Sequence, residues 1–568
     1  MRTLLIRFRR RTLLLALAIL GISASALPAA VITVGSDGAC NHTTITNALF
    51  AAIAAGPDEI RIARNQAYTN IFIHLTDWSP ATTGVVTLAG GYDTCSDTVP
   101  SGHTTIDGQA ANPVVEVDTS GQPTSEVILR NLDLTGSGEE GLRVEGGGIV
   151  TSTGNLLRSN LGGGAVVVDG GTFHVDAGTE ILQNSNSGIT CFTGSEVNFA
   201  GWIHDNTATA GAGIVAGSSC DMNILTGAWI RGNDAAFGGG LFASSGASVH
   251  VDGSGTSSFE TQIEGNTATD QGGGIYATGS GTVVLLWNAS VNNNDAGDEG
   301  GGIWASSSAL VTMDRVEGNC FNPLRCTNLS SNGVVGGAHG AAAWVESGAD
   351  LQLYQTRVES NTNDPAAPVG SVLFATGAGS TVTVEGVNFW NNQGPDALFE
   401  GQVGSSVSAA FVTASGNSYN SGTLPASPIA LTGGSTGTLN SSIYFPNSSV
   451  IGGASLTEVD CLILSNTTGL PGGASFINTS DPLFVSAAVG NLRLRPSSPA
   501  VDYCDTVLYT PVHFDGDHEQ RGFDLAFNAN GTPGVTGGIY DLGFDEVAPL
   551  FSDGFETSNT SAWSTTVP

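Results

Sequence analysis

The sequence has no lysine: all 17 of its basic residues are arginines, set against 51 aspartates and glutamates. Five arginines lie in the first eleven residues, which leaves 12 against 51 acids and a formal charge of −39 for the rest. Such a surface repels nucleic acid and anionic lipid, so we expect no nucleic-acid partner. Charged residues make up only 12% of the chain and hydrophobic residues 40%, which excludes a highly charged disordered chain.

Long apolar runs are missing after the first 30 residues. Residues 1–30 have the pattern of a secretory signal: an arginine-rich start, the apolar run Leu13–Ile22 and small residues before Val31. The run is too short to span a bilayer, which disfavours an uncleaved anchor, and no later stretch reaches roughly 18 to 20 uninterrupted apolar residues. We therefore expect a protein that is secreted or held at the outer cell surface, with no membrane span in the mature chain.

The eight cysteines have no CxxC spacing of the kind that zinc sites use. An even number in an exported chain favours disulfides, although spacing alone does not determine which cysteines pair. The pairs we expect are Cys40 with Cys95, Cys191 with Cys220, Cys320 with Cys326, and Cys461 with Cys504.

Glycine is abundant, with 79 residues, and it marks a repeat in the middle of the chain. Each repeat has glycines, an apolar-x-small triplet, a small polar turn and an apolar-x-apolar triplet. The repeats begin at Gly162, Gly211, Gly238, Gly272, Gly300 and Gly340. Downstream, an apolar residue stands three positions before an asparagine: Ile181/Asn184, Ile203/Asn206, Ile230/Asn233, Ile263/Asn266, Val291/Asn294, Val316/Asn319, Val358/Asn361 and Phe389/Asn392.

The middle residue of the first triplet gives the register of the repeats. These residues are Val166, Thr190, Val215, Phe242, Tyr276, Trp304, Trp344 and Phe374, separated by 24 to 40 positions. A variable period with a fixed internal pattern indicates one structural unit per coil, with insertions in the loops. Alternation with period two predicts short strands with one buried face, and equivalent strands of successive coils pair in parallel about 4.8 Å apart.

The pattern therefore predicts an all-β fold, a right-handed parallel β-helix. The corner asparagines suit a left-handed backbone conformation and can hydrogen-bond from coil to coil. A leucine-rich repeat is excluded because its leucine spacing is absent, and a propeller would need antiparallel blades of longer period.

The two ends of the chain carry different patterns. Residues 43–53 have apolar positions at helical spacing before Gly56 and Pro57, which predicts an N-terminal capping helix, with strands at 59–62 and 85–88. This segment, with GGYDTCSD, resembles the amino-terminal region of bacterial secreted right-handed parallel β-helix proteins, which share the pectin-lyase-like fold.

Near the carboxyl end, residues 481–502, 513–521 and 540–546 resemble a "choice-of-anchor Q" type module, which implies a C-terminal capping module. The coils are also similar to chlamydial polymorphic outer-membrane protein repeats, and residues 551–563 resemble a C-terminal motif of secreted gammaproteobacterial proteins. We expect a signal peptide (1–30), an N-terminal cap with the first coils (31–110), the β-helix (111–480), the anchor-type module (481–548) and a tail motif (549–568).

The register suggests a binding surface. If Ile275 and Ala277 point inward, Tyr276 points outward, and the same holds for its equivalents. The ladder formed by Phe242, Tyr276, Trp304, Trp344 and Phe374 could stack on sugar rings or on an apolar partner. The alternative is that the long insertions before Tyr276 and Trp344 fold back over these rings.

A second outward column lies one residue before each corner apolar residue. It comprises Glu180, Trp202, Trp229, Gln262, Ser290, Arg315, Arg357 and Asn388. Trp202 over Trp229, and Arg315 near Arg357, could line a groove, although scattered solvated side chains are the commoner arrangement.

Acids collect after the corner asparagines at Asp234, Asp270, Asp295, Asp298 and Glu299. Stacked coils could bring Asp295, Asp298 and Glu299 together as calcium ligands, and Asp515 with Asp517 suggests the same. Asp270, Asp295, Asp298 and Glu299 could also supply a carboxylate pair for glycoside hydrolysis. A hydrated acidic turn is the commoner explanation, because turns favour aspartate.

Known catalytic patterns are absent from the sequence. The coil arginines do not cluster with the acids as a polysaccharide lyase would need, and no Gly-x-Ser-x-Gly elbow, phosphate loop or histidine-rich metal site occurs. We therefore favour a non-enzymatic, adhesin-like module that binds polysaccharide or cell-surface glycan through the ladder, without a cofactor except possible Ca²⁺. The alternative is a carbohydrate-active enzyme, a lyase or glycoside hydrolase, that uses the corner acids.

Overall fold

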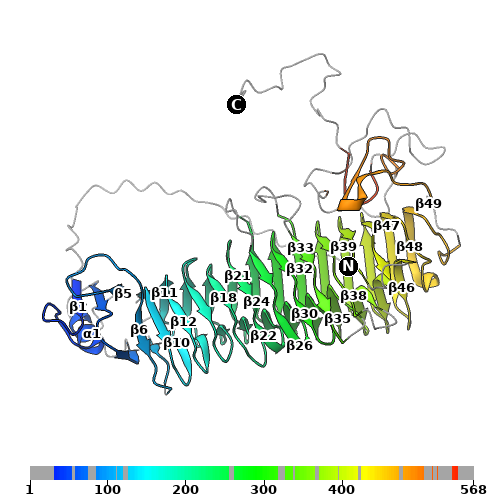
Figure 1. The fold of residues 1–568 in the computed structure, drawn as a ribbon. Coiled ribbons are helices and arrows are strands. Elements are labelled where there is room, and N and C mark those ends of the chain that lie inside the picture. The colour runs from blue at the N-terminus through cyan, green and yellow to red at the C-terminus, as the bar shows by residue number, and fades with distance from the viewer. Residues whose placement is uncertain are drawn as a thin grey trace, which may run out of the picture.

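The computed structural model describes residues 31–53, 58–74, 85–110, 112–118, 126–254, 261–316, 327–336, 339–364, 370–393, 396–419, 424–472, 477–503 and 540–547, with Asp515 and Arg521. The expected signal segment (1–30), the tail motif (549–568), Asp517, Cys320, Cys326 and Cys504 lie outside these residues. The described chain forms an elongated stack of coils, with the N-terminal coils at one end and the later coils at the other (Figure 1).

Three sheets, all with parallel pairing, run along the stack. Sheet A has 30 strands in the described chain, arranged as two columns that follow each other within every coil. The first column comprises β1 (Val31–Val34), β2 (Asp58–Ala63), β5 (Val85–Tyr92), β8 (Glu126–Arg130), β11 (Ile149–Thr153), β14 (Thr172–Val175), β17 (Glu196–Phe199), β20 (Asp221–Ile224), β24 (Ser248–Asp252), β28 (Val283–Trp287), β32 (Leu310–Asp314), β36 (Asp350–Tyr354), β39 (Thr381–Glu385), β42 (Ser406–Ala410), β47 (Thr436–Tyr444) and β48 (Leu456–Leu464). The second column comprises β3 (Tyr68–Thr69), β6 (Thr104–Asp107), β9 (Leu132–Thr135), β12 (Leu156–Arg158), β15 (Glu180–Leu182), β18 (Trp202–His204), β21 (Trp229–Arg231), β25 (Gln262–Glu264), β29 (Ser290–Asn292), β33 (Asn328–Ser330), β37 (Arg357–Glu359), β40 (Asn388–Trp390), β43 (Thr413–Ser415) and β49 (Ile477–Asn478).

Sheet B forms another side of the stack, and sheet C is short. Sheet B comprises β4 (Ile71–His74), β7 (Val115–Asp118), β10 (Glu140–Glu145), β13 (Gly163–Val167), β16 (Ile189–Cys191), β19 (Ile214–Ala216), β23 (Leu241–Ser244), β27 (Ile275–Thr278), β31 (Ile303–Ser306), β35 (Ala343–Glu346), β38 (Ser371–Thr376), β41 (Ala397–Gln402) and β46 (Ser427–Leu431). Sheet C comprises β22 (Asp234–Phe237), β26 (Thr267–Gln271), β30 (Asp295–Ala296) and β34 (Gly333–Val334). The parallel β-helix architecture predicted from the repeat is therefore confirmed.

One continuous apolar core fills the stack because most strands alternate inward and outward residues. In β23, Leu241 and Ala243 are fully buried, whereas Phe242 between them points to the outer face. The same alternation recurs from coil to coil, so each coil covers the core of the next. A coil would expose apolar surface on its own, which is why such repeats are stable only as a stack.

Asparagines form a ladder at the corner after the second column of sheet A. The backbone N–H and Nδ2 of Asn233 both donate to Asn266 Oδ1, at 3.1 and 3.0 Å. The ladder comprises Asn160, Asn184, Asn206, Asn233, Asn266, Asn294, Asn332, Asn361, Asn392 and Asn417. All of these side chains are buried, so the hydrogen bonds satisfy polar groups that water cannot reach.

Two details of the predicted corner are wrong. The rung after Asn294 is Asn332 with Leu329, not Asn319 with Val316, because β33 pairs Leu329 with Val291. The left-handed residue is the one before each ladder asparagine, as at Gln183 (φ 53°), rather than the asparagine itself. None of the ladder asparagines has a positive φ.

The N-terminal end carries α1 (Ile45–Ile53), the one α-helix of the described residues, at the predicted place. Ala48 and Ala52 are buried in the main core, and this helix contacts β2. Figure 1 shows α1 at the N-terminal end of the stack. The predicted strands at 59–62 and 85–88 lie within β2 and β5. A capping role for this end remains a prediction.

At the other end, the chain after the coils adds a second apolar cluster. The strands β50 (Phe484–Ser486) and β51 (Asn491–Leu494) pair antiparallel, as do β44 (Ser418–Tyr419) and β45 (Leu424–Pro425). Leu492 and Leu542 pack with Ile443 in that second cluster. Short 3₁₀ turns lie at Gly453–Ser455 and Ala487–Val489. The anchor-type module expected at 481–548 remains a prediction.

Two of the four expected disulfides are formed among the described residues. Cys40 bonds Cys95, and Cys191 bonds Cys220 within the core. Cys461 is also disulfide-bonded, and the remaining three cysteines lie outside the described residues.

Candidate functional site

The outward column of sheet B has the register predicted from the sequence. Phe242 pairs with Tyr276, Tyr276 with Trp304, and Trp304 with Trp344. Phe374 then pairs with Trp344 on one side and with Glu400 on the other. The five aromatic residues therefore lie one above another on a single face of the stack.

The rings of this aromatic ladder cover one another, which the sequence did not indicate. The ring centroids of Phe242 and Tyr276 are 5.0 Å apart with planes 9° apart, and those of Tyr276 and Trp304 are 4.2 Å apart at 16°. The coil spacing of about 4.8 Å nearly equals an aromatic stacking distance. Ring faces are therefore covered by the neighbouring ring within Phe242, Tyr276 and Trp304, and between Trp344 and Phe374, whose centroids are 4.1 Å apart.

Burial corrects the expectation of a water-exposed strip. Trp304 is 4% exposed and Phe374 is 2% exposed, while Phe242, Tyr276 and Trp344 are half-buried. Burial also raises the pKa of the Tyr276 hydroxyl. A sugar ring needs an open aromatic face, and the ladder offers mainly ring edges.

A polar group that the sequence analysis missed ends the ladder. Glu400 follows Phe374 in the same column, and its Oε2 lies 2.9 Å from His339 Nδ1. The His339 ring packs on Phe374 with centroids 4.7 Å apart. Burial favours the neutral acid, but the hydrogen bond and charge of His339 outweigh it and lower the pKa of Glu400. In the sequence, His339 stands alone among repeat glycines, so no site was predicted there.

The second predicted column also has the expected register, with one correction. Glu180, Trp202, Trp229 and Gln262 pair in succession along β15, β18, β21 and β25. After Ser290 the column continues with Asn328, not Arg315, because residues 317–326 are an insertion that shifts the next strand to β33. The column then reaches Arg357 and Asn388 as predicted.

Trp202 and Trp229 form the open aromatic pair of this face. Their ring centroids are 5.4 Å apart and their planes are nearly perpendicular, at 87°. Trp202 is 37% exposed, and Trp229 Nε1 donates to Glu264 Oε2 at 3.1 Å. An edge-on pair leaves ring face uncovered, in contrast to the stacked ladder.

Charged side chains surround this pair at the neighbouring outward positions. The guanidinium carbon of Arg231 lies 4.4 Å from the Trp229 ring centroid and 5.7 Å from that of Trp202. His204 lies between two carboxylates, with Nε2 3.5 Å from Glu180 Oε2 and Nδ1 3.0 Å from Asp205 Oδ2. We call Glu180, Trp202, His204, Trp229, Arg231 and Glu264 the tryptophan patch.

Two of the corner acids lie on neighbouring coils, where the Asp298 N–H donates to the Asp270 carbonyl at 2.8 Å. Gln271 Nε2 donates to Glu299 Oε2 at 2.7 Å, and Asp295 Oδ1 lies against Gly333 of the next coil. Burial raises the pKa of Asp295. The side chain of Asp298 is exposed, and that of Asp270 is half-buried. These four acids do not form a three-ligand group in the part of the chain that the structure describes.

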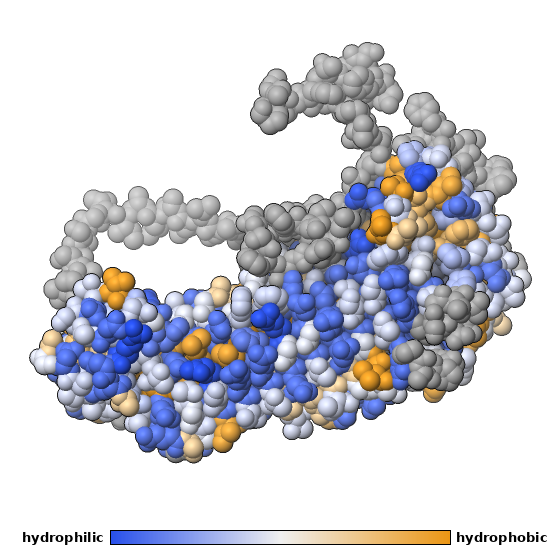
Figure 2. Space-filling view, in the orientation of Figure 1, coloured by the Kyte–Doolittle hydropathy of each residue, from blue (hydrophilic) through white to orange (hydrophobic). Residues whose placement is uncertain are grey.

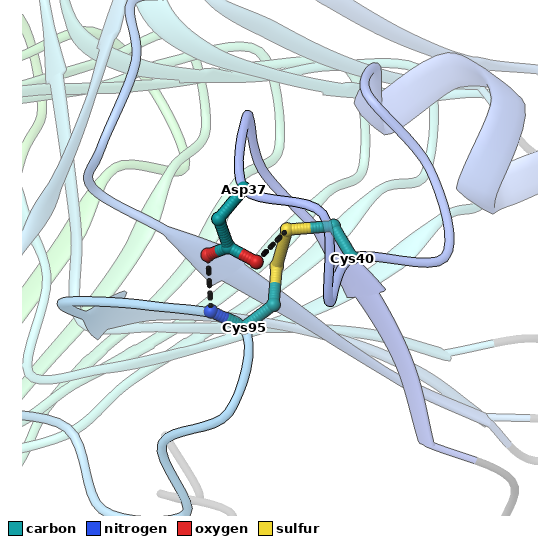
Figure 3. Close-up of side chains that lie close together, drawn as sticks. All are labelled: Asp37, Cys40 and Cys95. Carbon is teal, nitrogen blue, oxygen red and sulfur yellow. Dashed lines mark hydrogen bonds between the residues drawn. A yellow bond between two sulfur atoms is a disulfide. The ribbon is translucent and has the colours of Figure 1, made fainter.

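Among the described residues, the one group of three that could ligate a metal is Asp37, Cys40 and Cys95 (Figure 3). The two sulfurs are joined as a disulfide and are not free thiolate ligands. Asp37 Oδ2 accepts hydrogen bonds from Cys95 N and from Asn65 Nδ2, both at 3.0 Å. The aspartate therefore has a structural role in this loop.

Buried acids gather near the C-terminal end. Asp515 is fully buried, and its Oδ2 accepts the Glu546 backbone N–H at 3.1 Å. Asp541 Oδ1 accepts the Asp502 N–H at 2.7 Å, and Asp541 Oδ2 accepts the Val547 N–H at 2.6 Å. Burial, with the charge of Glu546, raises the pKa of Asp541 to about 8. Backbone N–H groups thus donate to the carboxyl groups of Asp515 and Asp541.

Comparison with known families agrees with the coil geometry. Residues 105–256 match the family model described as a right handed beta helix region. A search of curated proteins finds no match. No helix in the described part of the chain is long and apolar enough to cross a membrane. With the parallel pairing along sheets A, B and C, the chain is a β-helix repeat protein, and its residues 105–256 are similar to a right-handed β-helix region.

Proposed function

We propose that this protein is an exported, non-enzymatic binding module that holds glycan against the outer surface of its coils. The observation that carries the proposal is the exposed Trp202 ring, edge-on to the half-buried Trp229, which contacts Arg231 and Glu264. Aromatic faces bind the apolar faces of sugar rings, and flanking charged groups hydrogen-bond the hydroxyls. The aromatic ladder of sheet B is then a stabilising element beside the binding face rather than its centre.

The surface of the stack fits this role. Figure 2 shows a mainly hydrophilic face over the coils, with small, scattered hydrophobic patches. Large apolar interfaces usually need wider continuous patches, whereas a glycan needs a few aromatic platforms among polar groups. The enzymatic alternative would use a carboxylate pair such as Asp270 and Asp298, which lie on neighbouring coils where the Asp298 N–H donates to the Asp270 carbonyl at 2.8 Å. The four acids Asp270, Asp295, Asp298 and Glu299 form no three-ligand group in the described chain, which bears on metal binding and not on that pair.

The proposal is tested by binding of the purified chain to a panel of immobilised polysaccharides, with released sugar measured in parallel. We expect binding without turnover, and a loss of at least tenfold in affinity in the double variant Trp202→Ala, Trp229→Ala. Phe50→Ala is the matched control, because Phe50 is an exposed aromatic residue on α1 at the end of the stack.

Two results would overturn the proposal. One is binding that the tryptophan variant leaves unchanged while the variant melts like the parent protein. The other is release of product that disappears when Asp298 and Glu299 are replaced by alanine, which would establish the carbohydrate-active enzyme instead.

A further inference from the structure

The tryptophan patch has a regular geometry that constrains its ligand. Its outward residues form two parallel rows along the stack, because residues two apart on a strand share a face and successive coils lie about 4.8 Å apart. Glu180, Trp202 and Trp229 occupy one row, while His204, Arg231 and Glu264 occupy the other. The rows run along the stack axis, so a ligand that touches both tryptophans crosses successive coils.

Hydrogen-bond donors and acceptors alternate around the rings. Arg231 packs on both tryptophans and forms no ion pair with a carboxylate of the described chain, so its N–H groups are free to donate. Glu264 uses Oε2 for Trp229 Nε1, and its second oxygen has no described partner. A sugar hydroxyl both donates and accepts, so it can use either kind of group.

Charge in the patch opposes an anionic ligand. Glu180, Asp205 and Glu264 supply three carboxylates beside the single guanidinium of Arg231, and His204 is already placed between two of those acids. The whole chain carries a formal charge of −34. Charges beyond about 8 Å are screened at physiological ionic strength. The local excess of acid therefore makes the electrostatic potential at the patch negative. Sugars bearing carboxylates are disfavoured here even though an arginine is present.

We infer that the tryptophan patch selects an uncharged, extended glycan lying along the stack, with sugar rings on Trp202 and hydroxyls on Arg231 and Glu264. This inference rests on the proposed function and adds the ligand class. Arg231 acts as a neutral-sugar hydrogen-bond donor held in place by the two indole rings, rather than as an anion receptor.

The test uses two matched probes: a β-1,4-linked glucose hexamer, and the same hexamer oxidised to a carboxylate at every C6. Binding of each to the full chain is measured by calorimetry at low and at high salt. We expect the neutral hexamer to bind at least tenfold more tightly at low salt, and the difference to shrink in high salt as repulsion is screened. Arg231→Gln should weaken binding of the neutral hexamer several-fold, whereas Arg130→Gln, at another exposed arginine, should not.

The outcomes separate this inference from the proposed function. Equal or tighter binding of the oxidised hexamer overturns the inference and leaves glycan binding at the tryptophans intact. Failure of both hexamers to bind also overturns the inference, while the polysaccharide panel with the Trp202/Trp229 variant decides the proposed function separately. Binding of the neutral hexamer that Arg231→Gln does not change would remove Arg231 from the site.

Discussion

Asn233 Oδ1 accepts two hydrogen bonds from Asn206, the residue at the same corner of the preceding coil: one from its backbone N–H at 3.1 Å and one from its Nδ2 at 3.0 Å. Asn233 in turn donates its own two N–H groups to Asn266. The Asn233 side chain thus accepts hydrogen bonds from the preceding asparagine and donates one to the next. Loss of one asparagine therefore removes hydrogen bonds on both sides of it. The corner is a polar core that runs parallel to the apolar one.

Asn233→Ala should therefore destabilise the protein strongly. It leaves the buried backbone N–H of Asn206 without its acceptor and removes the Nδ2 donor to Ile203 O, whereas Asn206 Nδ2 keeps Ile181 O as an acceptor. Each buried group left unpaired costs about 1 to 3 kcal/mol, so we expect a loss of roughly 2 to 5 kcal/mol. Chemical denaturation of the full chain measures the change. Asn223→Ala is the control, since Asn223 is an outward residue of β20, and we expect it to shift stability by less than about 0.5 kcal/mol. Equal effects of the two substitutions would contradict the ladder's role.

The buried disulfide of Cys191 and Cys220 gives a second prediction. It closes a loop with a sequence separation of 29, for which chain entropy predicts about 3 to 4 kcal/mol of stabilisation. The double variant Cys191→Ala, Cys220→Ala should lose about this amount in denaturant unfolding. Both side chains are fully buried, so the alanines also leave a small cavity. A reducing agent should then lower the stability of the parent protein more than that of the variant. Equal sensitivity of the two to reduction would show that this bond contributes little.

Substitutions of Trp304 distinguish a structural role of the aromatic ladder from a role in ligand binding. Its ring stacks on Tyr276 at 4.2 Å, and its buried Nε1 has no hydrogen-bond partner among the described residues. Trp304→Ala should cost about 3 to 5 kcal/mol through the cavity that it leaves. Trp304→Phe keeps a stacking ring and removes the unpaired N–H, so we expect a change below about 1.5 kcal/mol.

Glycan affinity should stay the same in Trp304→Phe if the ladder is structural. The measurement pairs thermal unfolding with the polysaccharide binding assay on the same preparation. A variant that folds as the parent does but loses glycan binding would restore the ladder as the binding surface.

Register was the most predictable property of this chain. A stacked coil repeats one inside-outside pattern, so the alignment of Phe242, Tyr276, Trp304, Trp344 and Phe374 followed from the sequence alone. The error at Asn332 arose where residues 317–326 are inserted, because an insertion can present a false copy of the apolar-x-x-Asn pattern. Periodicity fixes the phase of a strand but not the length of the loop before it.

Exposure and contacts were less predictable, because they depend on distances between coils. Alternation placed Trp304 outward correctly, but only the stacking distance shows that Tyr276 covers it. The pair of Glu400 and His339 joins residues 61 positions apart, and neither residue belongs to a recognisable motif. The openness of Trp202 likewise depends on its angle to Trp229, which no sequence pattern encodes.

Asp541 makes the stability of the C-terminal end depend on pH. The side chain is 1% exposed, and burial with the nearby Glu546 raises its pKa from an ordinary value near 3.8 to about 8. Because the folded-state pKa lies above the unfolded one, the protonated acid is favoured by folding. Its stabilising contribution is fully present below about pH 4 and is lost as pH rises from there through about 8. We expect this loss to reach several kcal/mol.

Asp541→Asn mimics the protonated form, so it should flatten this pH dependence and leave the C-terminal end more stable than the parent at pH 8. Hydrogen exchange of residues 484–503 and 540–547 between pH 4 and 8, corrected for the intrinsic exchange rate, measures the stability of each segment of this end. Asp169→Asn is the control, because Asp169 is exposed and shares no contact with this cluster. Protection that rises with pH in the parent protein, or a variant with the same pH profile, would show that Asp541 is ionised in the folded state. The carboxyl would then need a cation that compensates its burial, since backbone N–H groups alone would not hold a charge there so readily.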